Sequence, residues 1–469
     1  MLDKKLDPAN VGKYINHRGP FWKETLWVFI FSLTFIALFP IGAAGQAAAP
    51  GATAPAQAGV LGTGAQTPLR FAGESVPENQ ASLSFGTSAF YDDNVLSTGT
   101  QRLGDEAVSF NSRLGISRRT EHVTINFDYM PFFMLYRQID QFDRLNHTAN
   151  LGLTFQLTSR FSLGLHDTFS YQNGVYPALT GQQILSGPVS PTALNQMIFS
   201  PTTRTLSNMS GLDLMFIKSR RTSLTLSGGY DQRKFGNQGA AGQPLYNDTG
   251  VSGSLQYQYR VTENTSFGFL VVHQDSTYQG GQAFGYRQRS QIESASFSVG
   301  SRLSPTVTVT VFGGPQYIRT IGQSSVGISI PGAFQGSGGG SITKEVGKTA
   351  LNLSLQRSVS DGGGLYTSAI NTNATFGIRR RLVGRWETDL HGGAARSDAS
   401  LFQNVNGKTD TLMGGIDFCR PLGGGAVFHV SYDTTHQLSK GSLPVSASLD
   451  RNQVTIGFDY QFKPLPLGR

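Results

Sequence analysis

The chain has 469 residues, a formal net charge of +8, 14% charged and 38% hydrophobic residues, 57 glycines and a mean hydropathy of −0.18. This balance excludes a helical membrane protein and a highly charged disordered chain, and it is typical of β-structure in which apolar and small polar residues alternate. The basic excess includes no dense Lys/Arg run and no recognisable nucleic-acid module, so we expect no nucleic-acid partner.

The first predicted element is a secretory signal peptide at residues 1–45. Residues 26–39, LWVFIFSLTFIALF, are the only long apolar run; a basic segment precedes them and the small residues GAAGQAAAP follow. The run is short for a membrane-spanning helix and its flanks match a cleavable signal, although an uncleaved inner-membrane anchor is a competing interpretation. Residues 46–79 are rich in Ala, Gly, Pro and Gln, and they predict a flexible linker without a core.

Alternation of apolar and polar residues then recurs from residue 80 to residue 462, and each such segment predicts a β-strand. Very short connections alternate with long loops rich in Gly, Asn, Pro and Gln. This asymmetry predicts an all-β fold, an up-and-down antiparallel transmembrane β-barrel of about 16–18 strands. The predicted short turns are at 158–160, 218–221, 262–264, 304–306, 383–384 and 422–425, and the longest predicted loops are at about 172–204, 235–248 and 318–336.

A soluble β-sandwich or solenoid is the alternative fold. A sandwich would bury its apolar faces against a second sheet and would not need such consistent asymmetry of turns, and the fixed-period repeats of a solenoid are absent. In lipid, every backbone polar group must be paired internally, so a sheet must close on itself and its apolar side chains face hydrocarbon. We therefore expect outer-membrane lipid to surround the apolar face.

The segment FYDDNVL, residues 90–96, directly follows the first predicted strand. It is similar to the aromatic-Asp-Asp-Asn motif near the first strand of the putative β-barrel porin 2 family. The resemblance implies an outer-membrane barrel of a family that includes barrels found alongside exopolysaccharide and exosortase systems. Chemically, Asp92, Asp93 and Asn94 could line a pore mouth or bind a cation, but such a group more often forms an Asx-turn that starts a loop, and we favour the turn.

The last predicted strand ends in VTIGFDYQF, residues 454–462. It resembles the C-terminal assembly signal of bacterial outer-membrane barrels, an alternating strand that closes with aromatic-x-Phe, although a C-terminal tail, residues 463–469, follows it here. The resemblance implies that the barrel assembly machinery is a partner. The candidate signal residues are Val454, Ile456, Phe458, Tyr460 and Phe462.

Charged and titratable side chains on the inward-facing parity of the predicted strands are candidate pore-lining residues. A basic lining favours anions in a wide pore, whereas the alternative is that several arginines lie only at the short-turn rim. A single lumenal histidine is most often a polar lining residue. The candidates are Asp128, His166, Arg260, Arg302, Arg379, His429 and Asp459.

Signatures of covalent chemistry are missing from the sequence. There is no His-Glu-x-x-His motif and no complete Gly-x-Ser-x-Gly elbow, and GSGGGS at 336–341 lacks the strand-to-helix context of a phosphate loop. The single cysteine, Cys419, excludes an intramolecular disulfide. We therefore expect neither an enzyme nor a cofactor.

The predicted function is a porin-like outer-membrane channel for passive or weakly selective diffusion of small solutes, formed after signal-peptide cleavage. Two other interpretations stay open. One is a barrel of a polysaccharide export or secretion system with a periplasmic export partner, and the other is a non-conducting surface or adhesion barrel that acts through its long loops. The sequence does not distinguish a monomer from a homo-oligomer.

Overall fold

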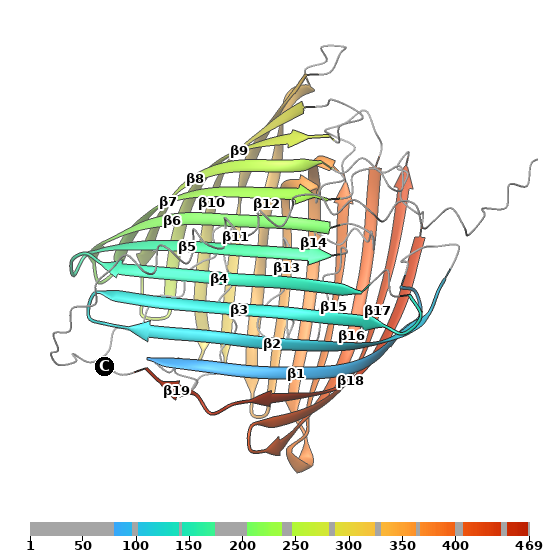
Figure 1. The fold of residues 1–469 in the computed structure, drawn as a ribbon. Helices are drawn as coiled ribbons and strands as arrows, with labels where there is room; N and C mark the ends of the chain where they lie inside the picture. The colour runs from blue at the N-terminus through green and yellow to red at the C-terminus, as the bar shows by residue number, and fades with distance from the viewer. Residues whose placement is uncertain are drawn as a thin grey trace, which may run out of the picture. The chain divides into compact units, whose positions relative to one another are not determined.

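A single antiparallel sheet contains every strand that the structure describes, and this sheet closes on itself. β1 (Gln80–Asp92) pairs with β2 (Asp105–Arg119) on one side and with β18 (Ser448–Gln461) on the other, and the strands between them pair with their neighbours in the chain. Figure 1 shows this order as a continuous change of colour from blue β1 to red β18. The fold is therefore an all-β, up-and-down antiparallel barrel of 18 strands, as predicted.

Most of the chain from residue 79 onward is described by this computed structural model. The described residues belong to the second of two units, Ala58–Arg469, and the predicted signal peptide and nearly all of the predicted linker lie outside them. Among the described residues, no helix is long and apolar enough to cross a membrane. The described ranges are 79–95, 102–139, 143–173, 204–236, 246–280, 287–323, 330–362, 366–398, 407–441 and 448–467.

The other strands run in chain order around the barrel. A two-residue strand, β19 (Leu465–Pro466), pairs with Gln80 and Ala81, so part of the predicted C-terminal tail extends the sheet beside β1. The remaining elements are β3 (Val123–Tyr136), β4 (Arg144–Gln156), β5 (Phe161–Asn173), β6 (Arg204–Ser219), β7 (Thr222–Phe235), β8 (Asn247–Arg260), β9 (Thr265–Gln279), β10 (Arg287–Ser304), β11 (Val307–Gln323), β12 (Ile330–Val346), β13 (Thr349–Gly362), β14 (Tyr366–Arg381), the 3-10 turn η3 (Val383–Arg385), β15 (Glu387–Asp398), β16 (Gly407–Gly423) and β17 (Ala426–Gly441).

The two ends of the barrel differ in the length of their connections. At the short-turn end, only Gly347 and Lys348 separate β12 from β13, and Gly347 has φ +56°, in the left-handed region that tight hairpin turns require and glycine adopts without strain. All the short turns predicted from the sequence lie at this end. The longer connections lie at the opposite end, the loop end, and their central residues are outside the described ranges.

The outward-facing positions carry a belt of large apolar side chains. Leu226, Leu355 and Ile456 are 53%, 56% and 50% exposed, and the residues that alternate with them are Ser, Thr, Gly or Gln. No protein layer covers these outward side chains, so their burial requires a lipid environment. This arrangement is the architecture of a transmembrane β-barrel.

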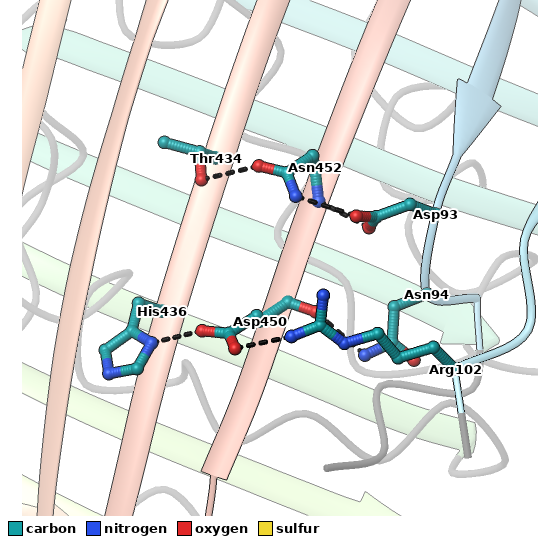
Figure 2. A network of polar contacts seen from close by, with 7 residues as sticks. All are labelled: Asp93, Asn94, Arg102, Thr434, His436, Asp450 and Asn452. Atoms are coloured by element: carbon teal, nitrogen blue, oxygen red, sulfur yellow. Dashed lines mark hydrogen bonds and ion pairs between the residues drawn. The ribbon is translucent and has the colours of Figure 1, made fainter. Parts of the chain in front are cut away.

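The closing seam between β1 and β18 is held at the loop end by the FYDDNVL motif. Asn94 N donates to Asp92 Oδ1 at 3.0 Å, which confirms the predicted Asx-turn. The Asp93 carboxylate accepts hydrogen bonds from the backbone N (2.6 Å) and the side-chain Nδ2 (2.7 Å) of Asn452 (Figure 2). The carboxylate of Asp92 pairs with the buried guanidinium of Arg451. The motif therefore fastens the first strand to the last, in addition to starting a loop.

A second part of the same seam faces outward at the loop end. Asp450 accepts hydrogen bonds from His436 on β17 and from Arg102 Nη2 at 2.5 Å, and its backbone carbonyl accepts one from Asn94 Nδ2 at 2.8 Å. Figure 2 shows these side chains bridging the last two strands and the segment after β1. These side-chain contacts thus reinforce the backbone hydrogen bonds that join the first strand of the barrel to the last.

The part of the β13–β14 hairpin nearer the loop end leaves the barrel wall and packs against the inner face of β10 and β11. Pairing of β12 with β13 stops at Gly338 and Arg357, although β13 and β14 remain paired above that point. Val359 N donates to Gln316 Oε1 at 3.0 Å, and Gln316 Nε2 donates to the Val359 carbonyl at 3.1 Å. The side-chain amide of Gln316 thus replaces the backbone pairing that β12 does not supply.

Apolar packing fixes this hairpin, which we call the tucked hairpin (residues 358–362 and 366–370). Val359 and Ile370 are buried against Ile292 and Ile318, and Ser290 Oγ lies 2.9 Å from Ser368 Oγ. Val359 has the same parity as Leu355, which faces outward lower on the strand. The side-chain face of β13 that points outward near the short-turn end is therefore buried inside the barrel near the loop end.

Candidate functional site in the lumen

Most of the predicted pore-lining residues lie in ion pairs on the inner wall. Each such pair joins adjacent strands, so the two charges partly neutralise one another where they meet the lumen. The pairs are Asp128 with Arg113 (2.8 Å), His166 with Asp213 (3.3 Å), Arg379 with Asp389 (3.3 Å) and His429 with Asp459 (3.1 Å).

Arg260 and Arg302 lie at the short-turn rim. Arg260 is the last residue of β8, and the guanidinium of Arg302 donates to the carbonyl of Pro305 in the next turn at 3.0 Å. The structure therefore agrees with the rim interpretation for these two residues. Anion preference stays a prediction.

The three inward-facing histidines of the described chain share one arrangement. Each lies opposite the glycine of a Gly-x-Asp segment on the next strand in the chain, and its Nδ1 faces Oδ2 of that aspartate. The segments are Gly211-Leu-Asp213 for His166 (3.3 Å), Gly415-Ile-Asp417 for His391 (3.5 Å) and Gly457-Phe-Asp459 for His429 (3.1 Å).

Glycine is required in these segments because the imidazole lies directly over it. A Cβ at Gly211, Gly415 or Gly457 would lie 2.1, 2.4 or 2.4 Å from Nε2 of the facing histidine. Real side chains do not approach so closely, so any other residue would displace the ring. The Gly-x-Asp pattern therefore supplies both the space for the imidazole and the carboxylate that it faces.

The arrangement around His391 contains more carboxylates than the other two. Asp389 on β15, Asp417 on β16 and Asp433 on β17 surround the ring, and Asp433 Oδ1 lies 3.1 Å from His391 Nε2. Asp389 and Asp417 are direct cross-strand partners. We call these four residues the lumenal acidic cluster.

Several polar atoms of this cluster make no hydrogen bond within the described structure. They are Asp389 Oδ1, His391 Nδ1 and Asp417 Oδ2, and the side chains of His391 and Asp417 are only 3% and 6% exposed. The Asp433 side chain is 24% exposed. The cluster thus combines buried acceptors with one more accessible carboxylate. Among the described residues, no group of three or more His, Cys, Asp or Glu side chains is placed to hold a metal ion.

The candidate assembly-signal residues lie on the outward face. Their alternation continues the apolar belt, and the Phe458 ring packs against Phe428 on β17 with ring centroids 5.0 Å apart. Their exposed fractions are 43% for Val454, 50% for Ile456, 51% for Phe458, 43% for Tyr460 and 44% for Phe462. Recognition of this strand by the assembly machinery stays a prediction.

Comparison with known proteins gives structural likenesses only. No family model and no curated protein matches this chain, so membership of the putative β-barrel porin 2 family stays a prediction. Similar solved structures include Pseudomonas aeruginosa OccK2 in complex with glucuronate (13% identity, 82% of this chain and 98% of that chain, TM-score 0.43), the FrpB iron transporter of Neisseria meningitidis (8%, 82% and 82%, 0.42) and Acinetobacter baumannii OccAB3 (11%, 82% and 99%, 0.41).

Proposed function

We propose that the protein is an outer-membrane channel through which small solutes diffuse. The observation that carries the proposal is the division of the wall: the outward positions are apolar, whereas the inward positions carry paired Asp, His and Arg side chains. Charged groups of this kind require an aqueous or polar interior. Barrels of about 16–18 strands are wide enough to enclose an aqueous channel.

The outer membrane is the proposed location because closed β-barrels of this type are the β-structures that satisfy all backbone groups in lipid. The proposal includes removal of the predicted signal peptide, recognition of residues 454–462 by the barrel assembly machinery, and contact of the apolar belt with outer-membrane lipid. It includes no covalent chemistry and no cofactor. It makes no claim about a homo-oligomer or a periplasmic export partner.

Two features narrow the interior on the loop side of the wall. The tucked hairpin covers the inner face of β10 and β11. Near the loop end of β1–β3, Phe90 and Met134 on inward-facing strand positions form part of a buried apolar cluster together with Val95, which follows β1. A channel with such obstructions should conduct less than an unobstructed barrel with the same number of strands, so we propose restricted diffusion of small solutes.

The export-barrel interpretation rests on FYDDNVL alone. In the structure the polar side chains of this motif bind residues of the last strand, and this role accounts for them without an external partner. The motif therefore gives no reason to prefer export over diffusion, and the surface-barrel interpretation depends on loops outside the described residues.

The decisive experiment is single-channel recording of the full-length protein, purified from membranes and shown to be folded by heat-modifiable electrophoretic mobility. We expect steady conductance steps in a planar bilayer, and none from the same preparation after heat unfolding. Silence from the folded protein would overturn the channel and favour a non-conducting surface barrel.

A further inference from the structure

The tucked hairpin leaves both of its neighbouring strands near its base. Pairing of β13 with β12 ends at Arg357 and Gly338. Pairing of β14 with β15 ends at Ile370 and Asp398. Nearer the loop end, β13 and β14 stay paired with one another alone. The hairpin is therefore a two-stranded flap whose backbone pairing with the rest of the sheet ends at its base, as in a hinged element.

The departure of the hairpin leaves a free edge on β12, residues 333–337. These residues pair with β11 on one side and with no described strand on the other. Arg357, at the start of the gap, is the exposed outward residue that follows Leu355, so the free edge begins where the apolar side chains of β13 end. Unpaired backbone groups are costly in hydrocarbon but can bond to water or headgroups near the loop end. The edge is therefore tolerated, and it stays available for strand pairing.

The free edge matches the strand that left it. Continuing the register beyond the pair of Gly338 and Arg357 places Val359 directly opposite Gly336. A Cβ at Gly336 would meet no atom within 4 Å, so this position has room for a cross-strand neighbour. The edge thus offers the hairpin a second position, which we call the wall position, as an extension of the existing ladder.

The same apolar pair suits both positions. Val359 and Ile370 are cross-strand partners, and Val359 has the parity of Leu355, which faces outward at 56% exposure. In the tucked position this pair is buried against Ile292 and Ile318. In the wall position it would extend the apolar belt toward the loop end. The pair is therefore covered by protein in one position and by the membrane in the other.

The backbone of Val359 is also satisfied in both positions. In the tucked position its N–H donates to Gln316 Oε1 at 3.0 Å, and its carbonyl accepts from Gln316 Nε2 at 3.1 Å. In the wall position the free edge of β12 would supply the donor and the acceptor, and the amide of Gln316 would face the lumen. Two packings that satisfy the same groups can lie close in free energy, which a bistable element requires.

We propose that the tucked hairpin is a movable flap that gates the lumen by exchanging its tucked position for the wall position. In the tucked position it covers the inner face of β10 and β11, and in the wall position it clears that face. The gating rests on the proposed channel, because it needs a conducting lumen. The movement itself depends only on the fold and is measured separately.

A disulfide between Gly336→Cys and Val359→Cys traps the wall position, in the full-length protein with Cys419→Ser, folded in detergent. A disulfide needs Cβ atoms about 3.5–4.5 Å apart, whereas in the tucked position no atom lies within 4 Å of a Cβ at Gly336. We expect the cross-link to form on mild oxidation, measured as loss of maleimide-reactive thiols after unfolding. Its absence under conditions that fully cross-link Ser290→Cys to Ser368→Cys would overturn the movement.

A matched control distinguishes a defined second position from general looseness. Ile370 is 7% exposed and Val359 is 5% exposed, but Ile370 lies on β14, one strand beyond Val359. Gly336→Cys with Ile370→Cys should therefore stay reduced, and cross-linking of this pair at an equal rate would overturn the wall position. Adding Gln316→Ala to the first pair should speed its cross-linking by about tenfold or more, because two hydrogen bonds that hold the tucked position are lost.

A second measurement leaves both Gly336 and Val359 intact. Ser368 is 1% exposed in the tucked position and has the outward parity of Ile370 on β14, so the wall position would bring it to the outer surface. Ser368→Cys with Cys419→Ser changes little in shape. Its thiol should react slowly with a charged maleimide in the folded protein, and about tenfold faster when Gln316→Ala is added. Equal rates with and without Gln316→Ala would overturn the movement.

Conductance then separates the gate from the channel. The oxidised protein with Gly336→Cys and Val359→Cys should give larger single-channel steps than the same protein after reduction. A complete disulfide with unchanged steps would overturn the gate and leave the channel standing. A complete disulfide in a protein that never conducts would overturn the channel and leave the movement standing. Variants are compared at equal folded fraction, measured by heat-modifiable mobility.

Discussion

The Asp92 carboxylate and the Arg451 guanidinium form an ion pair across the closing seam, with side chains 0% and 4% exposed. Removing one partner of a buried pair leaves the other charge without compensation, which typically costs about 3–5 kcal/mol. We expect Asp92→Asn to lower the free energy of unfolding by about that amount, because it removes the carboxylate that faces the buried Arg451 guanidinium at the closing seam. Urea titration followed by heat-modifiable mobility measures the change.

Asp128→Asn is the control for this prediction. Asp128 pairs with Arg113 at 2.8 Å, but the side chains are 31% and 57% exposed, so the pair should contribute at most about 1 kcal/mol. A loss of stability in Asp92→Asn no larger than that in Asp128→Asn would contradict a fastening role for the motif.

Gly415 should be intolerant of a side chain, whereas Gly414 beside it should accept one. A Cβ at Gly415 would lie 2.4 Å from Nε2 of His391, while a Cβ at Gly414 would lie 3.7 Å from the nearest atom, the His391 carbonyl oxygen. We expect Gly415→Ala to displace the imidazole and cost about 1–3 kcal/mol of stability, with little change in Gly414→Ala. Chemical denaturation of the two variants side by side checks this, and equal stabilities would show that His391 does not lie over the glycine.

The alternation of residue types was sufficient to predict the barrel, but not every strand. The predicted loop at 318–336 is wrong in its extent, because β11 continues to Gln323 and β12 begins at Ile330. β12 is rich in glycine and so lacks the alternation that marks the other strands. Its glycines have a packing cause: a Cβ at Gly339 would lie 2.4 Å from the Leu355 carbonyl oxygen.

The inner wall was only partly predictable. Parity alone indicated that His166, His429 and Asp459 face inward, but their pairing depends on strand register, which short segments of sequence do not specify. The lumenal acidic cluster was missed for this reason, since it forms only when His391 lies opposite Gly415. The recurring Gly-x-Asp segments were the signal that could have suggested it. The tucked hairpin has no such signal, because it depends on where β12 and β13 separate.

The tucked hairpin should be joined to the wall by a designed disulfide. Ser290 Oγ and Ser368 Oγ lie 2.9 Å apart, so cysteines at both positions should cross-link on mild oxidation in a Cys419→Ser background. The cross-link should leave conductance unchanged, because it holds the hairpin where it already lies. Failure to cross-link, assayed by mobility with and without reductant, would place the hairpin elsewhere.

Releasing the same hairpin should widen the channel. Gln316 supplies both hydrogen bonds to the Val359 backbone, so Gln316→Ala leaves a buried N–H and C=O without their partner, at a cost of about 1–3 kcal/mol each. We expect larger or more variable conductance steps in this variant. Wild-type steps should return when the variant also carries the oxidised disulfide between Ser290→Cys and Ser368→Cys. Unchanged steps in Gln316→Ala would show that the hairpin does not limit conduction.

Lipid contact is tested by substitutions at two outward positions whose side chains are covered to the same extent by the rest of the protein. Leu226 and Val346 are each 53% exposed, but Leu226 lies within β7, whereas Val346 is the last residue of β12 beside a short turn. In a bilayer the cost of a charge on the outward face depends on depth. We expect Leu226→Lys to cost about 2–4 kcal/mol and Val346→Lys about 0–1 kcal/mol.

The measurement is reversible folding of both variants into lipid vesicles over a urea range. A fold surrounded by water would give nearly equal, small effects at the two positions, because neither leucine nor valine is covered by protein. A clear excess for Leu226→Lys would instead require hydrocarbon around the middle of the wall, since depth is then the main difference between the two sites. Equal effects would contradict the membrane-spanning orientation on which the channel depends.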